Sequence, residues 1–128
     1  MASQEGAAMA PDARFFYRRV LLLTPDPWLR ARLCGTLEEL GCLVQPFACE
    51  AEALTWAQDE IADLAMIDSL SGTGHGIALA AQLRHEGVPA VFFDGFDAER
   101  GLLSAEPPRH PGLPRRTPLS EVLEACLT

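Results

Sequence analysis

The chain has 128 residues, of which 18 are acidic and ten are basic, so its formal net charge is −8 at pH 7. This length fits a single domain, and a hydrophobic fraction of 48% supplies enough apolar side chains for a core. The acidic balance argues against nucleic acid or an anionic membrane as a partner. All ten basic residues are arginine, and the absence of lysine excludes phosphate-binding P-loops and lysine-dependent catalysis.

The spacing of the cysteines and the absence of targeting patterns indicate the cellular compartment of the protein. No run approaches the roughly 18 apolar residues of a membrane span, and residues 1–10 lack the apolar centre of a signal peptide. No cysteine pair has the C-x-x-C spacing of zinc or redox sites, which favours free thiols in a reducing compartment. We therefore expect a cytoplasmic protein without membrane contact. The cysteines are Cys34, Cys42, Cys49 and Cys126.

The beginning of the chain has no periodic apolar pattern. Residues 1–18 are expected to form a disordered or partner-docking tail, and residues 19–128 the folded domain. Three aromatic residues at positions 15–17 lie between arginines. We expect this aromatic run to dock on the domain or on a partner.

Strand and helix patterns alternate along the rest of the chain. Continuous apolar runs predict buried strands, and apolar residues at gaps of three and four predict helices. Asp26 suits the N-cap and Pro27 the first position of the first helix, and Thr117 suits the cap of the last. Strands are expected at residues 20–23, 42–47, 64–67, 88–93 and 113–116, and helices at 27–40, 50–58, 77–83, 97–104 and 118–127.

This alternation predicts an α/β fold, in which helices cover both faces of a doubly wound parallel sheet. In such folds the functional crevice lies outside the carboxyl ends of the strands. An aspartate follows three of the predicted strands, and these residues are Asp26, Asp68 and Asp94. The sequence therefore predicts three carboxylates that converge on one crevice.

Seven pieces of the sequence, taken in order, resemble the receiver domain of bacterial response regulators. The resemblance runs from about residue 19 to residue 127, and the order of the pieces carries more weight than any single piece. The resemblance implies a flavodoxin-like three-layer sandwich with a five-stranded parallel sheet of order 2-1-3-4-5. The pieces are VLLLxxDPxxR from residue 20, LEELG from 37, EAL from 52, DLAMID from 63, GIALA from 76, GVPAVFF from 87, and the step Pro118-Leu119.

Asp68 matches the phosphoacceptor aspartate of this family, whose carboxylate attacks a phosphohistidine of a partner kinase. The resemblance also implies a divalent metal that neutralises the phosphoryl oxygens. Receivers hold this metal with an acidic pair after the first strand, which here falls on Thr24 and Pro25. The lysine that receivers carry before a proline falls on Thr117, and the Thr or Ser after the fourth strand falls on Asp94.

These departures favour a degenerate phosphorylation site without a cofactor. Thr24, Asp26, Asp94 and Thr117 would surround Asp68 as remnants of a crevice, with Asp26 serving as a helix cap. The alternative keeps the family's chemistry, with Asp68 phosphorylated, Mg²⁺ held by Asp26 and Asp68, and Asp94 as a further candidate ligand.

The favoured interpretation is a stand-alone receiver-like protein of bacterial two-component (phosphorelay) signal transduction that acts by protein–protein contact and is not an enzyme. A histidine kinase, another signalling protein or a second copy of the chain is the expected partner. A second alternative is a small flavodoxin-like enzyme with paired carboxylates for acid–base chemistry, which requires a substrate pocket. The expected partner face contains Leu102, Leu103, Arg115, Arg116 and Leu119.

Overall fold

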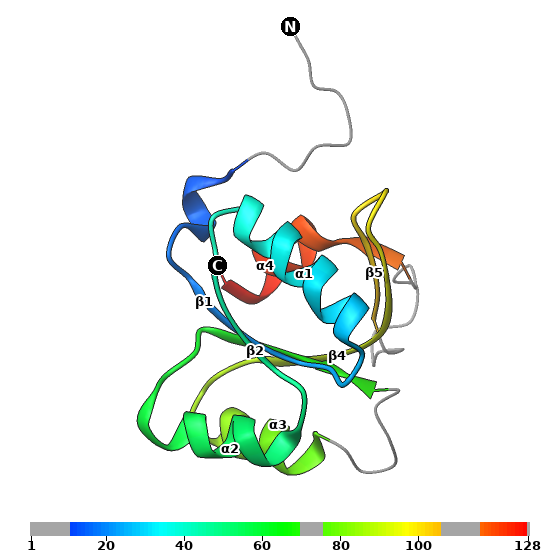
Figure 1. The fold of residues 1–128 in the computed structure, drawn as a ribbon. Coiled ribbons are helices and arrows are strands. Elements are labelled where there is room, and N and C mark those ends of the chain that lie inside the picture. The colour runs from blue at the N-terminus through cyan, green and yellow to red at the C-terminus, as the bar shows by residue number, and fades with distance from the viewer. Residues whose placement is uncertain (1–10, 70–75, 106–115, 128) are drawn as a thin grey trace, which may run out of the picture.

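A single mixed sheet forms the middle layer of the protein in the computed structural model, which describes residues 11–69, 76–105 and 116–127 (Figure 1). Over these residues the sheet has six strands in the order β2-β1-β3-β4-β5-β6. The strands are β1 (Arg19–Leu23), β2 (Leu43–Phe47), β3 (Leu64–Asp68), β4 (Ala90–Asp97), β5 (Leu102–Ala105) and β6 (Arg116–Pro118). The helices are η1 (Ala13–Phe15), α1 (Pro27–Glu39), α2 (Glu50–Asp59), α3 (Ile77–His85) and α4 (Leu119–Leu127).

Helices cover both faces of the sheet, so the central strands are buried on both sides. Side chains alternate along a strand, and β1 accordingly sends Val20 and Leu22 into one core and Leu21 and Leu23 into the other. Helices α1 and α4 pack on the first face, and α2 and α3 on the second (Figure 1). This arrangement explains why the two central strands read as continuous apolar runs.

Helix α1 begins where the sequence predicts. The Asp26 carboxylate accepts hydrogen bonds from the backbone N–H groups of Trp28 (2.9 Å) and Leu29 (3.2 Å), and Pro27 occupies the first helical position. Both features satisfy the free end of a helix without distorting it. The start of α1 is thereby fixed directly beside the carboxyl end of β1.

The predicted α/β, flavodoxin-like architecture is confirmed, but the second half of the sheet differs from the expected five parallel strands. The pairs β1–β2, β1–β3 and β3–β4 are parallel, whereas β4–β5 and β5–β6 are antiparallel. The expected helix at 97–104 is wrong, because β4 continues to Asp97 and turns directly into β5. Asp97 closes this turn by accepting from the N–H groups of Glu99 and Arg100 (both 3.1 Å), and Gly101 supplies a φ of 67°.

The last described strand pairs differently from the expected parallel arrangement. Strand β6 spans Arg116–Pro118 and pairs antiparallel with β5, with Thr117 opposite Leu103. Of the strand expected at 113–116, residues 113–115 lie outside the described residues, and Arg116 belongs to β6. The final helix follows at once, since α4 begins at Leu119.

The N-terminal segment from residue 11 packs on the domain. Phe15 is fully buried in the core between α1 and α4. The Asp12 side chain caps η1, and Arg14 forms a 3.0 Å ion pair with Glu124 of α4. Within the aromatic run at positions 15–17, the Phe15 side chain therefore docks on the domain. Residues 1–10 lie outside the described part of the chain.

The remaining structural expectations concern thiols and membrane spans. Cys42 is buried, Cys34 and Cys126 are half-buried, and Cys49 is exposed, all as free thiols. None of the helices in the described ranges has both the length and the apolar character that a membrane crossing requires.

Candidate functional site at the carboxyl ends of the strands

Asp68 is the last residue of β3 and one of two buried polar or charged residues in the described chain, with 4% of its surface exposed. The other is Thr24, which follows β1 and is fully buried. The Thr24 hydroxyl donates a 2.7 Å hydrogen bond to Oδ2 of Asp68. A hydrogen bond of this kind offsets part of the cost of burying a carboxylate.

The position of Thr24 is fixed by its own neighbours. Its backbone N–H donates to the Phe47 carbonyl on β2 at 3.1 Å, and its carbonyl accepts from Nη1 of Arg30 at 2.7 Å. The hydroxyl also accepts from the Asp26 N–H at 3.2 Å. Thr24 therefore connects the start of α1 to the carboxylate at the end of β3.

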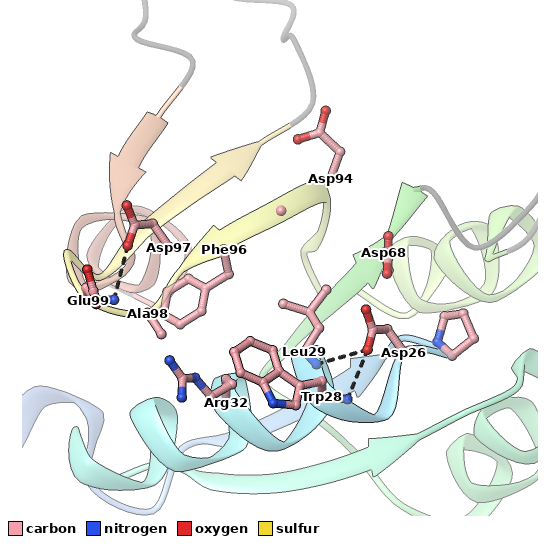
Figure 2. A pocket seen from close by; sticks show the side chains of 12 residues that line it. Asp26, Trp28, Leu29, Arg32, Asp68, Asp94, Phe96, Asp97, Ala98 and Glu99 are labelled. Atoms are coloured by element: carbon pink, nitrogen blue, oxygen red, sulfur yellow. Dashed lines mark hydrogen bonds between the residues drawn. The ribbon is translucent and has the colours of Figure 1, made fainter.

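Asp94 lies on β4 at an irregularity of the strand pairing. Phe93 pairs with Ala105 and Gly95 with Ser104, so Asp94 is the extra residue of a β-bulge. A bulge changes the direction of a side chain relative to regular strand geometry. In Figure 2 the Asp94 carboxylate points away from the carboxylates of Asp26 and Asp68.

The three aspartates nevertheless line one cavity, as the strand topology predicts. This cavity has a volume of about 570 Å³ and lies between α1 and the β4–β5 hairpin (Figure 2). Its lining also contains residues that sequence reasoning did not assign to the crevice. These additional lining residues are Pro25, Trp28, Leu29, Arg32, Gly95, Phe96, Asp97, Ala98 and Glu99.

Thr117 does not line this cavity. It lies on β6, which β5 separates from β4. Because neighbouring strands are about 4.8 Å apart, the inserted strand places position 117 about one strand spacing further from Asp68 than direct pairing with β4 would. The expected crevice therefore contains Thr24, Asp26 and Asp94 around Asp68, but not Thr117.

The expected partner face requires a correction at two residues. Leu103 and Leu119 are fully buried in the core, because β5 presents Leu103 and α4 presents Leu119 to the interior. Leu102 is half-buried, and Arg116 is exposed beside a smaller cavity of about 400 Å³. Arg115 lies outside the described residues.

The donor set in the crevice does not fit the divalent metal that the fold resemblance implies. Among the residues the structure describes, no group of three or more His, Cys, Asp or Glu side chains is arranged to hold a metal ion. Hard dications prefer several oxygen ligands, mostly carboxylates. The Oδ1 atom of Asp26 already accepts two backbone N–H groups, and Thr24 bonds to Asp68.

Sequence reasoning missed two parts of this site. Thr24 was expected in the crevice around Asp68, but the hydrogen bond that its hydroxyl donates to Asp68 was not predicted. The second part is the wall formed by Phe96, Asp97 and Glu99, which exists only because residues 97–104 form a hairpin. The aromatic residue at position 96 extends the apolar run of β4 beyond Asp94, which was a signal for a longer strand but not for the hairpin itself.

The fold defines the class of this chain as a doubly wound, flavodoxin-like α/β protein with an antiparallel extension. Among solved structures it is similar to the chemotaxis response regulator CheY4 of Vibrio cholerae, with a TM-score of 0.53 and 24% sequence identity. The similarity covers 59% of this chain and 67% of that chain. No family model matches the sequence, and no curated protein matches it. The resemblance to receiver domains is therefore confirmed at the level of the fold.

Proposed function

We propose that this chain is a receiver-like protein of two-component signal transduction that acts by protein–protein contact and not by phosphorylation of Asp68. The CheY-like fold supports the signalling role. The observation that carries the loss of phosphorylation is the 2.7 Å hydrogen bond from Thr24 to Asp68. By the sequence resemblance, Thr24 stands where receivers carry a metal-binding carboxylate.

The missing metal-binding carboxylate and lysine should raise the barrier to phosphoryl transfer considerably. A phosphoryl group brings negative charge, which receivers neutralise with a metal ion and a lysine. Here the chain contains no lysine, and two further acidic residues, Asp26 and Asp94, line the same cavity as Asp68. Loss of one preorganised electrostatic group raises a reaction barrier by about 3 to 4 kcal/mol. Two such losses make phosphorylation too slow for signalling, even though the effects are not strictly additive.

Under this proposal the protein is not an enzyme and needs no cofactor. Its signal depends on which protein occupies its surface, with a histidine kinase, another signalling protein or a second copy as candidates. The alternative, a phosphorylatable response regulator that uses Mg²⁺, has one observation in its favour. Asp26, Asp68 and Asp94 line the same cavity.

A magnesium titration distinguishes these two functions. Trp28 lines the cavity and is 68% exposed, so its fluorescence reports on a cation that binds there. In a Trp56→Phe background, we expect no saturable change in Trp28 fluorescence up to millimolar Mg²⁺. A saturable change that Asp68→Asn abolishes would instead establish the Mg²⁺-dependent regulator.

A further inference from the structure

The segment that precedes β1 is held on the domain mainly by Phe15. Its ring is fully buried in the core under α1 and α4, whereas its neighbours Arg14 and Phe16 are exposed. The ion pair between Arg14 and Glu124 is also exposed, with 50% and 52% of the two side chains accessible, so it adds little to the docking. A single apolar side chain therefore accounts for most of the attachment.

The turn after α1 receives this segment, which is dark blue in Figure 1. The Tyr17 N–H donates to the Gly41 carbonyl at 2.9 Å, and the Asp12 N–H donates to the Leu40 carbonyl at 3.2 Å. Gly41 has a φ of 109°, and a Cβ atom at this position would collide with the Phe16 ring. The ring thus lies directly on the backbone of the turn, where glycine leaves room for it.

Tyr17 has a backbone conformation that an L-residue with a side chain disfavours. Its φ is 64°, and among the described residues it is the sole residue other than glycine with a positive φ. In this left-handed region the Cβ atom crowds the following carbonyl oxygen. The Tyr17 side chain is 77% exposed, so burial of its ring does not offset this strain. Strain of this kind persists only while the surrounding contacts impose it.

We propose that residues 12–17 form a latch that opens and closes as a local unit while the sheet and its helices stay folded. When the latch opens, Phe15 leaves the core, the strain at Tyr17 is relieved and the segment regains backbone freedom. These gains offset part of the lost burial of Phe15, which makes the opening less costly than unfolding of the whole domain.

The latch gives the chain two states without the use of the Asp68 crevice. The open state vacates the Phe15 site in the core and exposes the aromatic run at positions 15–17. A partner that binds one of these states better would shift the population toward it. The latch is independent of the function proposed above, because it requires neither phosphorylation nor its loss.

Hydrogen exchange of the full chain, followed by NMR, tests the latch. The Tyr17 amide reports on the latch through its bond to Gly41, and the Ala65 amide reports on the sheet through its 2.9 Å bond to the Pro89 carbonyl. After correction for intrinsic rates, we expect Tyr17 to exchange roughly tenfold or more faster than Ala65. Low urea should accelerate Tyr17 much less than Ala65, because latch opening exposes less surface than global unfolding.

Two substitutions, one in each core, separate latch opening from global unfolding. Phe15→Ala should raise the Tyr17 exchange rate by roughly tenfold or more, because the opening removes this ring from the core. Leu79→Ala empties a fully buried site in the core under α2 and α3. It should raise the Ala65 rate and leave the Tyr17 rate unchanged within about twofold.

The contribution of strain is tested at position 17 itself. Tyr17→Asn and Tyr17→Ala both remove the exposed ring, but asparagine tolerates the left-handed region better than alanine. The amide at position 17 should therefore exchange roughly threefold more slowly in Tyr17→Asn than in Tyr17→Ala. Equal rates in these two variants would contradict the role of strain in the opening.

Equal urea dependence of the Tyr17 and Ala65 amides, which needs no substitution, would overturn the latch. An equal rise of both rates in Leu79→Ala would do the same, because the segment would then be released only by global unfolding. A Tyr17 rate that Phe15→Ala leaves unchanged would also contradict the proposal, since the segment would fray while Phe15 stays in the core.

Discussion

The Thr24 hydroxyl and the Asp68 carboxylate are joined by a 2.7 Å hydrogen bond between two buried side chains. Their strands make this contact possible, because β1 and β3 are parallel neighbours with Leu23 opposite Ile67. Thr24 and Asp68 are the next residues along these strands, at the edge where the crevice opens. The contact therefore occupies the centre of the candidate site.

Replacing Thr24 with valine should destabilise the fold, because the buried Asp68 carboxylate loses this donor while the side-chain volume is kept. The expected loss in the free energy of unfolding is about 1 to 3 kcal/mol, measured by urea denaturation. Thr55→Val is the matched control, since Thr55 is exposed and donates only to the Ala51 carbonyl within α2. Equal effects of the two substitutions would contradict a structural role for the Thr24–Asp68 bond.

The β4–β5 hairpin predicts different sensitivities for two adjacent leucines. Leu103 faces the core and Leu102 is half-buried on the opposite face of β5. Leu103→Ala should cost about 2 to 5 kcal/mol, and Leu102→Ala about 1 kcal/mol. Thermal and urea unfolding of both variants tests this order, and a larger loss for Leu102→Ala would contradict the strand assignment.

The N-terminal segment should contribute to stability through Phe15. Phe15→Ala empties a fully buried site and should cost about 3 to 5 kcal/mol. Tyr17→Ala removes a ring that is 77% exposed, and should change stability by less than about 0.5 kcal/mol. Comparable urea midpoints for the two variants would show that residues 11–18 do not pack on the domain as described.

Cys42 makes stability depend on alkaline pH. Burial raises the pKa of the Cys42 thiol from 9.0 to about 11. Between these values the unfolded chain releases the proton and the folded chain retains it, so the free energy of unfolding falls as pH rises from about 9 to about 11. Urea denaturation across this range should show a smaller decline for Cys42→Ala than for the wild type. Cys49→Ala, at an exposed thiol, should retain the wild-type decline.

Local patterns were sufficient to predict the first half of the fold. The apolar run of β1 and the Asp26-Pro27 start of α1 depend on neighbours in sequence, so they can be read without the tertiary structure. The hairpin after Asp97 could not be predicted in this way. Asp97 accepts from the N–H groups two and three residues later, which is also the pattern of a helix cap. Pairing of β5 with β4 and β6 decides between the two.

The sequence also predicted part of the candidate site, namely which aspartates lie at the crevice but not how their side chains are directed. Strand topology placed Asp26, Asp68 and Asp94 at one crevice, because the carboxyl ends of parallel strands share an edge of the sheet. The direction of the Asp94 side chain depends on a bulge that appears only when β4 pairs with β5. The Thr24–Asp68 bond likewise depends on the register of two strands and on a side-chain rotamer.

Phosphoryl labelling of the full chain tests the central claim most directly. The protein is incubated with acetyl phosphate and Mg²⁺, and covalent phosphate is measured by intact mass, with Asp68→Ala as the matched variant. The account predicts no stable label on either protein, because Thr24 bonds to Asp68, the chain has no lysine, and the described residues offer no group of three ligands for a metal ion. A stable label on the wild type that Asp68→Ala abolishes would contradict it.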